Sequence, residues 1–336
     1  MKEIDGAGGG GQLLRLAVAL ASLDGTAVKI ENIRGSREDP GLAHQHVAAV
    51  EAIETLTNAT TEGVSLGSET VTFDPGGPLG GSVEVEVGTA GSITLLFDAV
   101  LPLALGAKKP ITVKASGGTD VKWAPTIGYY QSVKLPVVNS IGLEASVRDI
   151  RHGFYPKGGG KANLGIEPSQ LQPLQLSNRG SLSRIEIHSI ASENLAKADV
   201  APRQITGVKE TLADSVSVPV SGESRSVESP STGTSVLVLA EYEQSLAGFS
   251  ALGEPGLPAE DVGASAAQKF LEFHAAEGAL DEHLADQLLP FVAIAGGRYT
   301  TPTITDHLSA AIPILESFGY SITVNTTGES VEIAGQ

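Results

Sequence analysis

Hydrophobic and polar positions follow a recurring order along the chain: an apolar or amphipathic helix, a polar or glycine turn, and then a β-branched strand. The first half predicts four such helices, at residues 13–23, 48–56, 93–105 and 129–141. The first and third helices start roughly 80 residues apart, and so do the second and fourth. This offset indicates a duplicated unit of helix, strand, helix and strand, and therefore an α+β fold.

The pattern is interrupted in the second half of the chain. Residues 167–179 are rich in Pro, Gln and Ser, a composition typical of a linker between domains. The succession of helix, glycine and strand returns after Asp281. We therefore expect one domain made of residues 1–180 and 276–336, interrupted by a small inserted α/β domain at residues 181–275.

The interrupting segment has its own elements. The pattern predicts strands at residues 183–189 and 235–242 and helices at 201–212 and 263–276. The Ser-rich run at residues 221–235 lacks apolar periodicity, so we interpret it as a mobile loop.

Composition sets the class of protein. The chain has 336 residues, and its 41% hydrophobic content can fill a sizeable core. The absence of cysteine excludes disulfides, thiolate metal sites and thiol catalysis, and it suits a reducing compartment. No apolar run approaches the roughly 20 residues that span a bilayer. We expect a cytoplasmic protein without a membrane partner.

The charge restricts contact with nucleic acid. A formal net charge of −17 argues against a general nucleic-acid coat protein, because non-specific affinity for a polyanion comes from Lys and Arg. Any RNA contact must therefore be local. The spread of acidic residues is typical of a solvated surface in a salt-rich cytoplasm, where the Debye length falls to about 3 Å near 1 M salt.

Two N-terminal segments suit phosphate binding. The run Gly8 to Gly11 opens a helix, where backbone N–H groups can approach an anion, although it equally suits a tight structural turn. It is not a Walker loop, because no Gly-Lys-Ser/Thr follows. Arg34 and Arg37 follow a predicted strand, and their guanidinium groups fit phosphates or remain solvated.

Two further segments, at residues 117–125 and 152–161, combine glycines, an aromatic residue and a lysine. This combination suits stacking on a base while holding its phosphate, and it also occurs in packed turns. In so acidic a chain, a set of basic residues lies in or beside glycine-rich loops: Arg15, Arg34, Arg37, Lys122, Arg151, Lys157 and Lys161. The set indicates a focused positive site.

The last two segments carry histidines, at residues 282–290 and 303–308. Neutral imidazole is a competent nucleophile near pH 7 and can take AMP from a nucleotide. A lone histidine is more often structural or exposed, and spacing alone makes His307 one of seven.

Together and in this order, the six segments resemble the RNA 3′-terminal phosphate cyclases of archaeal type. The most specific matches are residues 34–46, 117–125 and 153–160. The resemblance covers nearly the whole chain outside the insert. It implies a large domain of repeated βαβαββ units with pseudo-threefold symmetry, plus a small inserted α/β domain.

The resemblance also implies a reaction. AMP moves from ATP to a histidine, then to an RNA 3′-phosphate, and the adjacent 2′-hydroxyl displaces it to leave a 2′,3′-cyclic phosphodiester. A divalent cation, Mg or Mn, would neutralise phosphate charge. The matched catalytic residues are His307, Arg15, Arg34 and Arg37. Those matched to ATP binding are Asp98, His283, Leu284, Ala285, Asp286 and Gln287, and those matched to RNA or phosphate are Gln12, Lys122, Trp123 and Lys157.

Three positions depart from the family pattern. Gly8 replaces a glutamate, which leaves the metal ligands unassigned. Asp98 replaces a nucleotide-contacting glutamine, and its charge would be costly beside phosphates unless a cation or a proton offsets it. Ser309 and Ala310 stand where a Thr-Asn pair is more usual.

Two alternatives therefore accompany the active cyclase. One is a non-catalytic relative that binds RNA in ribosome assembly, favoured by the missing glutamate and disfavoured by the retained His307. The other is an enolpyruvyl transferase, which shares the repeat architecture but not these motifs, so fold alone does not separate the two. The sequence does not fix the oligomeric state.

Overall fold

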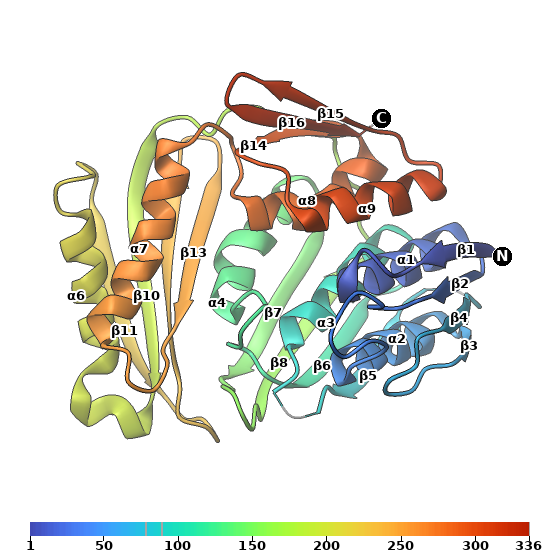
Figure 1. Cartoon of the computed structure of the whole chain (residues 1–336), viewed down its shortest axis with the longest axis horizontal. Coiled ribbons are helices and arrows are strands. Elements are labelled where there is room, and N and C mark those ends of the chain that lie inside the picture. Colours follow the sequence, from blue (N-terminus) through green and yellow to red (C-terminus); the bar gives the residue numbers. More distant parts are fainter. Residues whose placement is uncertain (78, 89, 336) are drawn as a thin grey trace.

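The computed structural model describes residues 1–77, 79–88 and 90–335, which form four four-stranded sheets and the helices that cover them (Figure 1). The first sheet has the order β1 (Lys2–Asp5), β2 (Val28–Glu31), β4 (Val71–Asp74) and β3 (Thr60–Glu62), with helices α1 (Gly10–Asp24) and α2 (His44–Thr57). The α+β class predicted from the sequence is confirmed.

The second and third sheets are built in the same way. The second has the order β5 (Gly81–Glu86), β6 (Ile111–Gly117), β8 (Gly160–Glu167) and β7 (Glu144–Arg151), and its helical segments are α3 (Ile93–Val100), η1 (Leu101–Leu105), α4 (Ile127–Tyr129), η2 (Tyr130–Lys134) and α5 (Leu135–Ser140). The third has the order β9 (Leu174–Leu176), β14 (Gly297–Thr301), β16 (Ser330–Gly335) and β15 (Ile322–Thr327), with α8 (Glu282–Ala295) and α9 (Asp306–Ser317).

The three sheets share one pairing pattern. In each, the first two strands pair in parallel, and both remaining pairs are antiparallel. Their helices gather between the sheets (Figure 1), where α1 contacts α2, α3 and α9, and α8 contacts α9. Apolar residues on nearly every side of α1, from Leu13 to Ala21, are buried in this shared core. Because the helices converge, their N-terminal ends can build one site.

Two predicted helices change form part-way. The segment predicted at residues 93–105 is α-helical to Val100 and then turns into the 3₁₀ segment η1, which contains Pro102. The segment predicted at 129–141 passes through the π-helical turn η2 before α5, where Pro136 stands near the start. Proline has no backbone N–H and crowds the preceding turn, so a regular α-helix does not run through either position.

The fourth sheet has the order β11 (Val220–Val227), β10 (Leu182–Ser192), β12 (Thr234–Tyr242) and β13 (Leu246–Leu252), with the short η3 (Glu193–Ala198) and the long helices α6 (Val200–Leu212) and α7 (Ala259–Ala275). It lies to one side of the other three (Figure 1). Ile185, Val238 and Phe270 belong to a separate cluster of buried apolar side chains.

The loop predicted at residues 221–235 is wrong for residues 221–227, whereas residues 228–233 do form a loop before β12. Residues 220–227 form β11, which pairs in parallel with β10 from Ile185 to Ser192. β11 is an edge strand whose side chains are exposed or half-buried throughout, so its sequence carries no apolar alternation. Within the described ranges, no helix is both long and apolar enough to cross a membrane.

Candidate active site

The glycine run and the two loop arginines lie together at the N-terminal ends of α1 and α2. The Arg34 side chain donates to the carbonyl oxygen of Gly41 at 2.8 Å, and Arg34 itself adopts a left-handed φ of 56°. The Arg37 guanidinium lies 3.6 Å from where a Cβ on Gly10 would stand. Ser36 donates to the carbonyl of Ala7 at 2.8 Å, which ties the two loops together. The arrangement places positive charge beside a helix N-terminus, as an anion site requires.

His46 is the buried centre of this region. Its Nδ1 accepts from the backbone N–H of Ala43 at 3.0 Å, and its Nε2 would lie only 1.9 Å from a Cβ on Gly11, so α1 needs glycine there. Burial, together with the charges of Arg15 and Arg34, lowers the pKa of His46 to about 3. His46 is therefore neutral near pH 7, and because its side chain is buried we interpret it as a structural group rather than the nucleophile.

Asp98 is paired with a cation. Its carboxylate on α3 accepts from the ammonium group of Lys134 on η2, and the Lys134 side chain is 3% exposed. Burial lowers the pKa of Lys134, whereas Asp98 raises it. Asp98 also offsets the effect of burial on the pKa of Arg15. The charge that departs from the family pattern is thus offset inside the protein by a cation, the Lys134 ammonium group.

The predicted adenylate segment forms the first turns of α8. The Asp281 side chain caps this helix by accepting from the backbone N–H groups of His283 and Leu284 at 3.1 and 2.9 Å. His283, Asp286 and Gln287 lie three and four residues apart and so share one face of the helix. Leu284 and Ala285 are fully buried in the core, backbone included, so neither presents surface to a ligand here.

His307 stands in the first turn of α9, opposite this face. Thr305 caps α9 by accepting from the Leu308 N–H at 3.0 Å, and its hydroxyl donates to Asp286 Oδ1 at 2.5 Å. The other oxygen of Asp286 lies 3.6 Å from Nδ1 of His307. The His307 side chain is 59% exposed and that of Asp286 only 7%. A buried carboxylate therefore faces one nitrogen of an accessible imidazole, leaving the other nitrogen open.

Tyr129 connects the two halves of the site. Its hydroxyl donates to Asp281 at 3.3 Å. Burial raises the pKa of Tyr129 well above its usual value, and the carboxylates of Asp281, Asp98 and Asp286 raise it further. Tyr129 is therefore near enough to Asp98 on α3 and Asp286 on α8 for both charges to affect its pKa.

The predicted RNA-contacting residues lie in two places. Gln12 is half-buried in the first turn of α1, near the glycine run. Lys122 pairs with Glu254 at 2.8 Å, beside Trp123, which is 95% exposed and has a left-handed φ of 60°. The exposed Lys157 donates its backbone N–H to Ser231. Lys122 and Lys157 therefore contact the segment that carries the fourth sheet, residues 181–275. They lie away from the pairing of Asp286 with His307.

Sequence reasoning missed the residues that hold these groups. Lys134, His46, Tyr129 and Thr305 each act through a partner distant in the chain or through an ordinary-looking helix start. The one local signal is Thr305, a good N-cap residue two positions before His307. Among the side chains the structure describes, no three His, Asp or Glu groups converge as metal ligands.

Comparisons with known proteins identify the family of this chain. A family model described as RNA 3′-terminal phosphate cyclase matches residues 7–324. The chain is 41% identical to the RNA 3′-terminal phosphate cyclase of Halobacterium salinarum, covering 99% of both chains. It is 38% identical to that of Archaeoglobus fulgidus over 95% of both, and 39% identical to that of Pyrococcus furiosus over 92% of this chain and 90% of the relative.

Among solved structures, the enolpyruvyl transferase NikO from Streptomyces tendae overlaps 51% of this chain and 33% of its own, with a TM-score of 0.30 and 13% identity. That overlap is too small to bear on fold or function. The family model and the relatives instead match the chain almost end to end, through the segments that carry Arg34, Asp286 and His307. The chain belongs to the RNA 3′-terminal phosphate cyclase family of enzymes.

Proposed function

We propose that this chain uses ATP to convert an RNA 3′-phosphate end into a 2′,3′-cyclic phosphodiester through AMP carried on His307. The observation that carries the proposal is the placement of His307: exposed on the first turn of α9, with the buried Asp286 carboxylate 3.6 Å from Nδ1. That distance exceeds a hydrogen bond, but a nearby carboxylate favours the proton on Nδ1. The lone pair of Nε2 is then free to attack.

The first step transfers AMP to the enzyme. Nε2 of His307 forms a bond to the α-phosphorus of ATP, and the bond from that phosphorus to pyrophosphate breaks. Arg15, Arg34 and Arg37, together with the backbone N–H groups at the start of α1, stabilise the phosphate charge. The amide oxygen of Gln287 is buried and has no hydrogen-bond partner in the described part of the chain, so a rotation of this side chain would let it accept from an adenine amino group.

The second and third steps act on RNA. An oxygen of the 3′-phosphate attacks the α-phosphorus, which breaks the bond to His307 and gives an RNA adenylate. The 2′-oxygen then attacks the 3′-phosphorus and loses its proton as AMP leaves. The vicinal hydroxyl is held next to its target, so this step gains from intramolecular proximity. The exposed Trp123 ring offers a stacking surface for a base.

A divalent cation, Mg²⁺ or Mn²⁺, is part of the proposal as a partner of the nucleotide. Magnesium is commonly held by one or two carboxylates and the substrate phosphates. The described residues hold no cluster of three carboxylate or imidazole ligands, and the space beside Gly8, where a side chain would begin, is open to at least 4 Å. We therefore assign the cation to the phosphates of ATP, where it would neutralise charge.

The architecture supports a second part of the proposal. The common strand order and pairing pattern of three sheets suit three βαβαββ units related by pseudo-threefold symmetry. The fourth sheet, with its own apolar cluster, suits a domain at residues 181–275 inserted after β9. We assign residues 1–180 and 276–336 to the large domain.

The test is labelling with α-labelled ATP and Mg²⁺ or Mn²⁺, followed by denaturing electrophoresis. We expect label on the wild type and none on His307→Ala, with His188→Ala as the control because His188 is a partly exposed histidine on β10, outside this site. RNA ending in a 3′-phosphate should become resistant to phosphatase. Absence of label with either metal, at low and high salt, would refute the adenylate and leave a non-catalytic RNA binder.

A further inference from the structure

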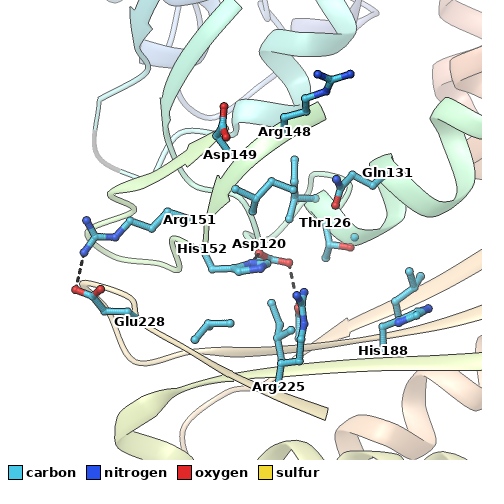
Figure 2. Close-up of a pocket in the computed structure, with 17 residues that line it drawn as sticks. Asp120, Thr126, Gln131, Arg148, Asp149, Arg151, His152, His188, Arg225 and Glu228 are labelled. Carbon is cyan, nitrogen blue, oxygen red and sulfur yellow. Dashed lines mark hydrogen bonds and ion pairs between the residues drawn. The ribbon is translucent and has the colours of Figure 1, made fainter. Parts of the chain in front are cut away.

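A cavity of about 530 Å³ lies between the second sheet and the fourth sheet (Figure 2). Its upper wall comes from β7 and the start of α4, and its lower wall from β10, β11 and β12. It is separate from the pairing of Asp286 with His307, because neither residue lines it. Its size fits a nucleotide or two.

All three carboxylates of the cavity already have partners. Asp120 lies 2.9 Å from Nδ1 of His152 and accepts from the Ser235 hydroxyl at 3.0 Å. Asp149 accepts from the side-chain amide of Asn163 at 2.7 Å. Their negative charge is held in place at the wall.

The third carboxylate, Glu228, pairs with Arg151 at 2.8 Å. Figure 2 shows Arg151 turned toward Glu228, whereas Arg225 reaches from β11 toward Asp120. Within the described residues, the guanidinium groups of Arg225 and Arg148 make no hydrogen bond or ion pair. Two exposed arginines thus line opposite walls of one cavity.

Both arginines lack a partner among the described residues although three carboxylates line the same cavity, because each of those carboxylates is engaged elsewhere. A guanidinium fork is matched to a phosphate, and Arg is favoured where planar recognition of phosphate matters. The cavity is therefore suited to an anionic ligand that brings its own phosphates.

The cavity is also joined to the proposed active site. Thr126 lines the cavity and caps α4 by accepting from the Tyr129 N–H at 3.2 Å. Tyr129 in turn donates its hydroxyl to Asp281 at the start of α8. One short helical segment thus forms a wall of the cavity at one end and a support of the His307 region at the other.

We infer that this cavity binds the RNA strand upstream of the reacting 3′ end, with Arg225 from the fourth sheet and Arg148 from β7 holding its phosphodiesters. The inference rests on the proposed function for the direction of the strand. It gives the segment at residues 181–275 a role: β11 supplies a cation for the substrate backbone. A dinucleotide substrate would not reach this cavity, whereas a 20-nucleotide RNA would.

The test compares the double variant Arg148→Gln/Arg225→Gln with the wild type. Fluorescence anisotropy with a 20-nucleotide RNA ending in a 3′-phosphate should show affinity about tenfold lower. The slope of log affinity against log salt should become shallower by about 1.4, because two phosphate contacts to a single strand are lost. AMP labelling of His307 and KM for a dinucleotide ending in a 3′-phosphate should stay unchanged.

A matched control removes two charges outside the cavity, Arg184→Gln/Lys209→Gln, and should leave the affinity for the 20-nucleotide RNA within about twofold. A third variant, Glu228→Gln, frees Arg151 and should tighten binding. Equal losses in the cavity and control variants, or unchanged affinity in the cavity variant, would overturn the inference. Failure of wild-type cyclisation would refute the proposed function alone, because anisotropy still reports RNA binding.

Discussion

At the residue scale, the imidazole of His307 depends on one buried carboxylate. Replacing Asp286 by Asn keeps the size of the side chain but removes the charge beside Nδ1 and the strong acceptor for Thr305. We expect AMP labelling of His307 to slow by about 10²-fold, a typical effect of losing a group that orients a proton. Single-turnover labelling with α-labelled ATP measures this rate.

The neighbouring exposed carboxylate provides the control for that experiment. Asp306→Asn removes the same charge one residue from His307, but Asp306 is exposed in the first turn of α9. Its labelling rate should remain within about threefold of the wild type. Equal slowing in the two variants would show that only general charge matters.

His46 makes stability depend on pH. Its pKa is about 3 in the folded protein and 6.5 as the ordinary value, so the unfolded chain binds a proton that the folded chain does not between these pH values. Folding stability contributed by neutral His46 is complete above pH 6.5 and is lost as pH falls, by at most roughly 1.4 kcal/mol per pH unit. The free energy of unfolding in urea should therefore fall more steeply from pH 7 to pH 5 for the wild type than for His46→Asn.

Comparing how the free energy of unfolding changes with pH in the two proteins separates the effect of His46 from that of the 39 carboxylates, which both proteins share. Measurements in 1 M KCl reduce general charge repulsion, because the Debye length falls to about 3 Å. His44→Asn provides a matched control at an exposed histidine two residues away, and it should keep the wild-type slope. If the free energy of unfolding changes equally with pH in the wild type and in His46→Asn, the low pKa of His46 in the folded protein is contradicted.

At the scale of elements, one ion pair joins α3 to η2. Lys134 and Asp98 are nearly buried, so removing one partner leaves an uncompensated charge in the core. We expect Asp98→Asn to lower the free energy of unfolding by about 3 kcal/mol, whereas Asp98→Gln/Lys134→Met should recover most of that loss. Urea unfolding measures both free energies. The control is Lys29→Met, which breaks a more exposed ion pair and should lower the free energy of unfolding by under about 1 kcal/mol. If the double variant is no more stable than Asp98→Asn, the loss of stability does not come from leaving the Lys134 charge unpaired.

The elements also show what the sequence can predict. Long apolar periodicity located α1, α2 and α6, because buried faces impose it. β11 was missed because an edge strand exposed on both faces leaves no such pattern. Arg225 was missed with it. His307 was found only through the order of several loops, and Lys134 was missed because its partner is 36 residues away.

At the scale of the whole molecule, one arginine ties the fourth sheet's segment to the rest. The Arg179 guanidinium donates to the carbonyl oxygens of Phe273, His274, Ala276 and Gly278 at 2.7 to 3.1 Å. It also lies 4.5 Å from the centre of the Phe273 ring. Arg179 precedes β10, and these carbonyls lie in the last turn of α7 or just after it, so a single side chain joins the chain's entry into this segment to its exit.

We predict that Arg179→Lys loosens the junction without unfolding either side, because lysine keeps the charge but cannot fill four acceptors in one plane. Hydrogen exchange should quicken at residues 273–278, while β10 and β12 keep their protection through their own apolar cluster. AMP labelling of His307 should persist, whereas affinity for a 20-nucleotide RNA should fall about tenfold, because the cavity needs both walls. Arg184→Lys, in an exposed pair on β10, is the control. Loss of labelling and RNA affinity together would mean that Arg179 supports the whole fold rather than the junction.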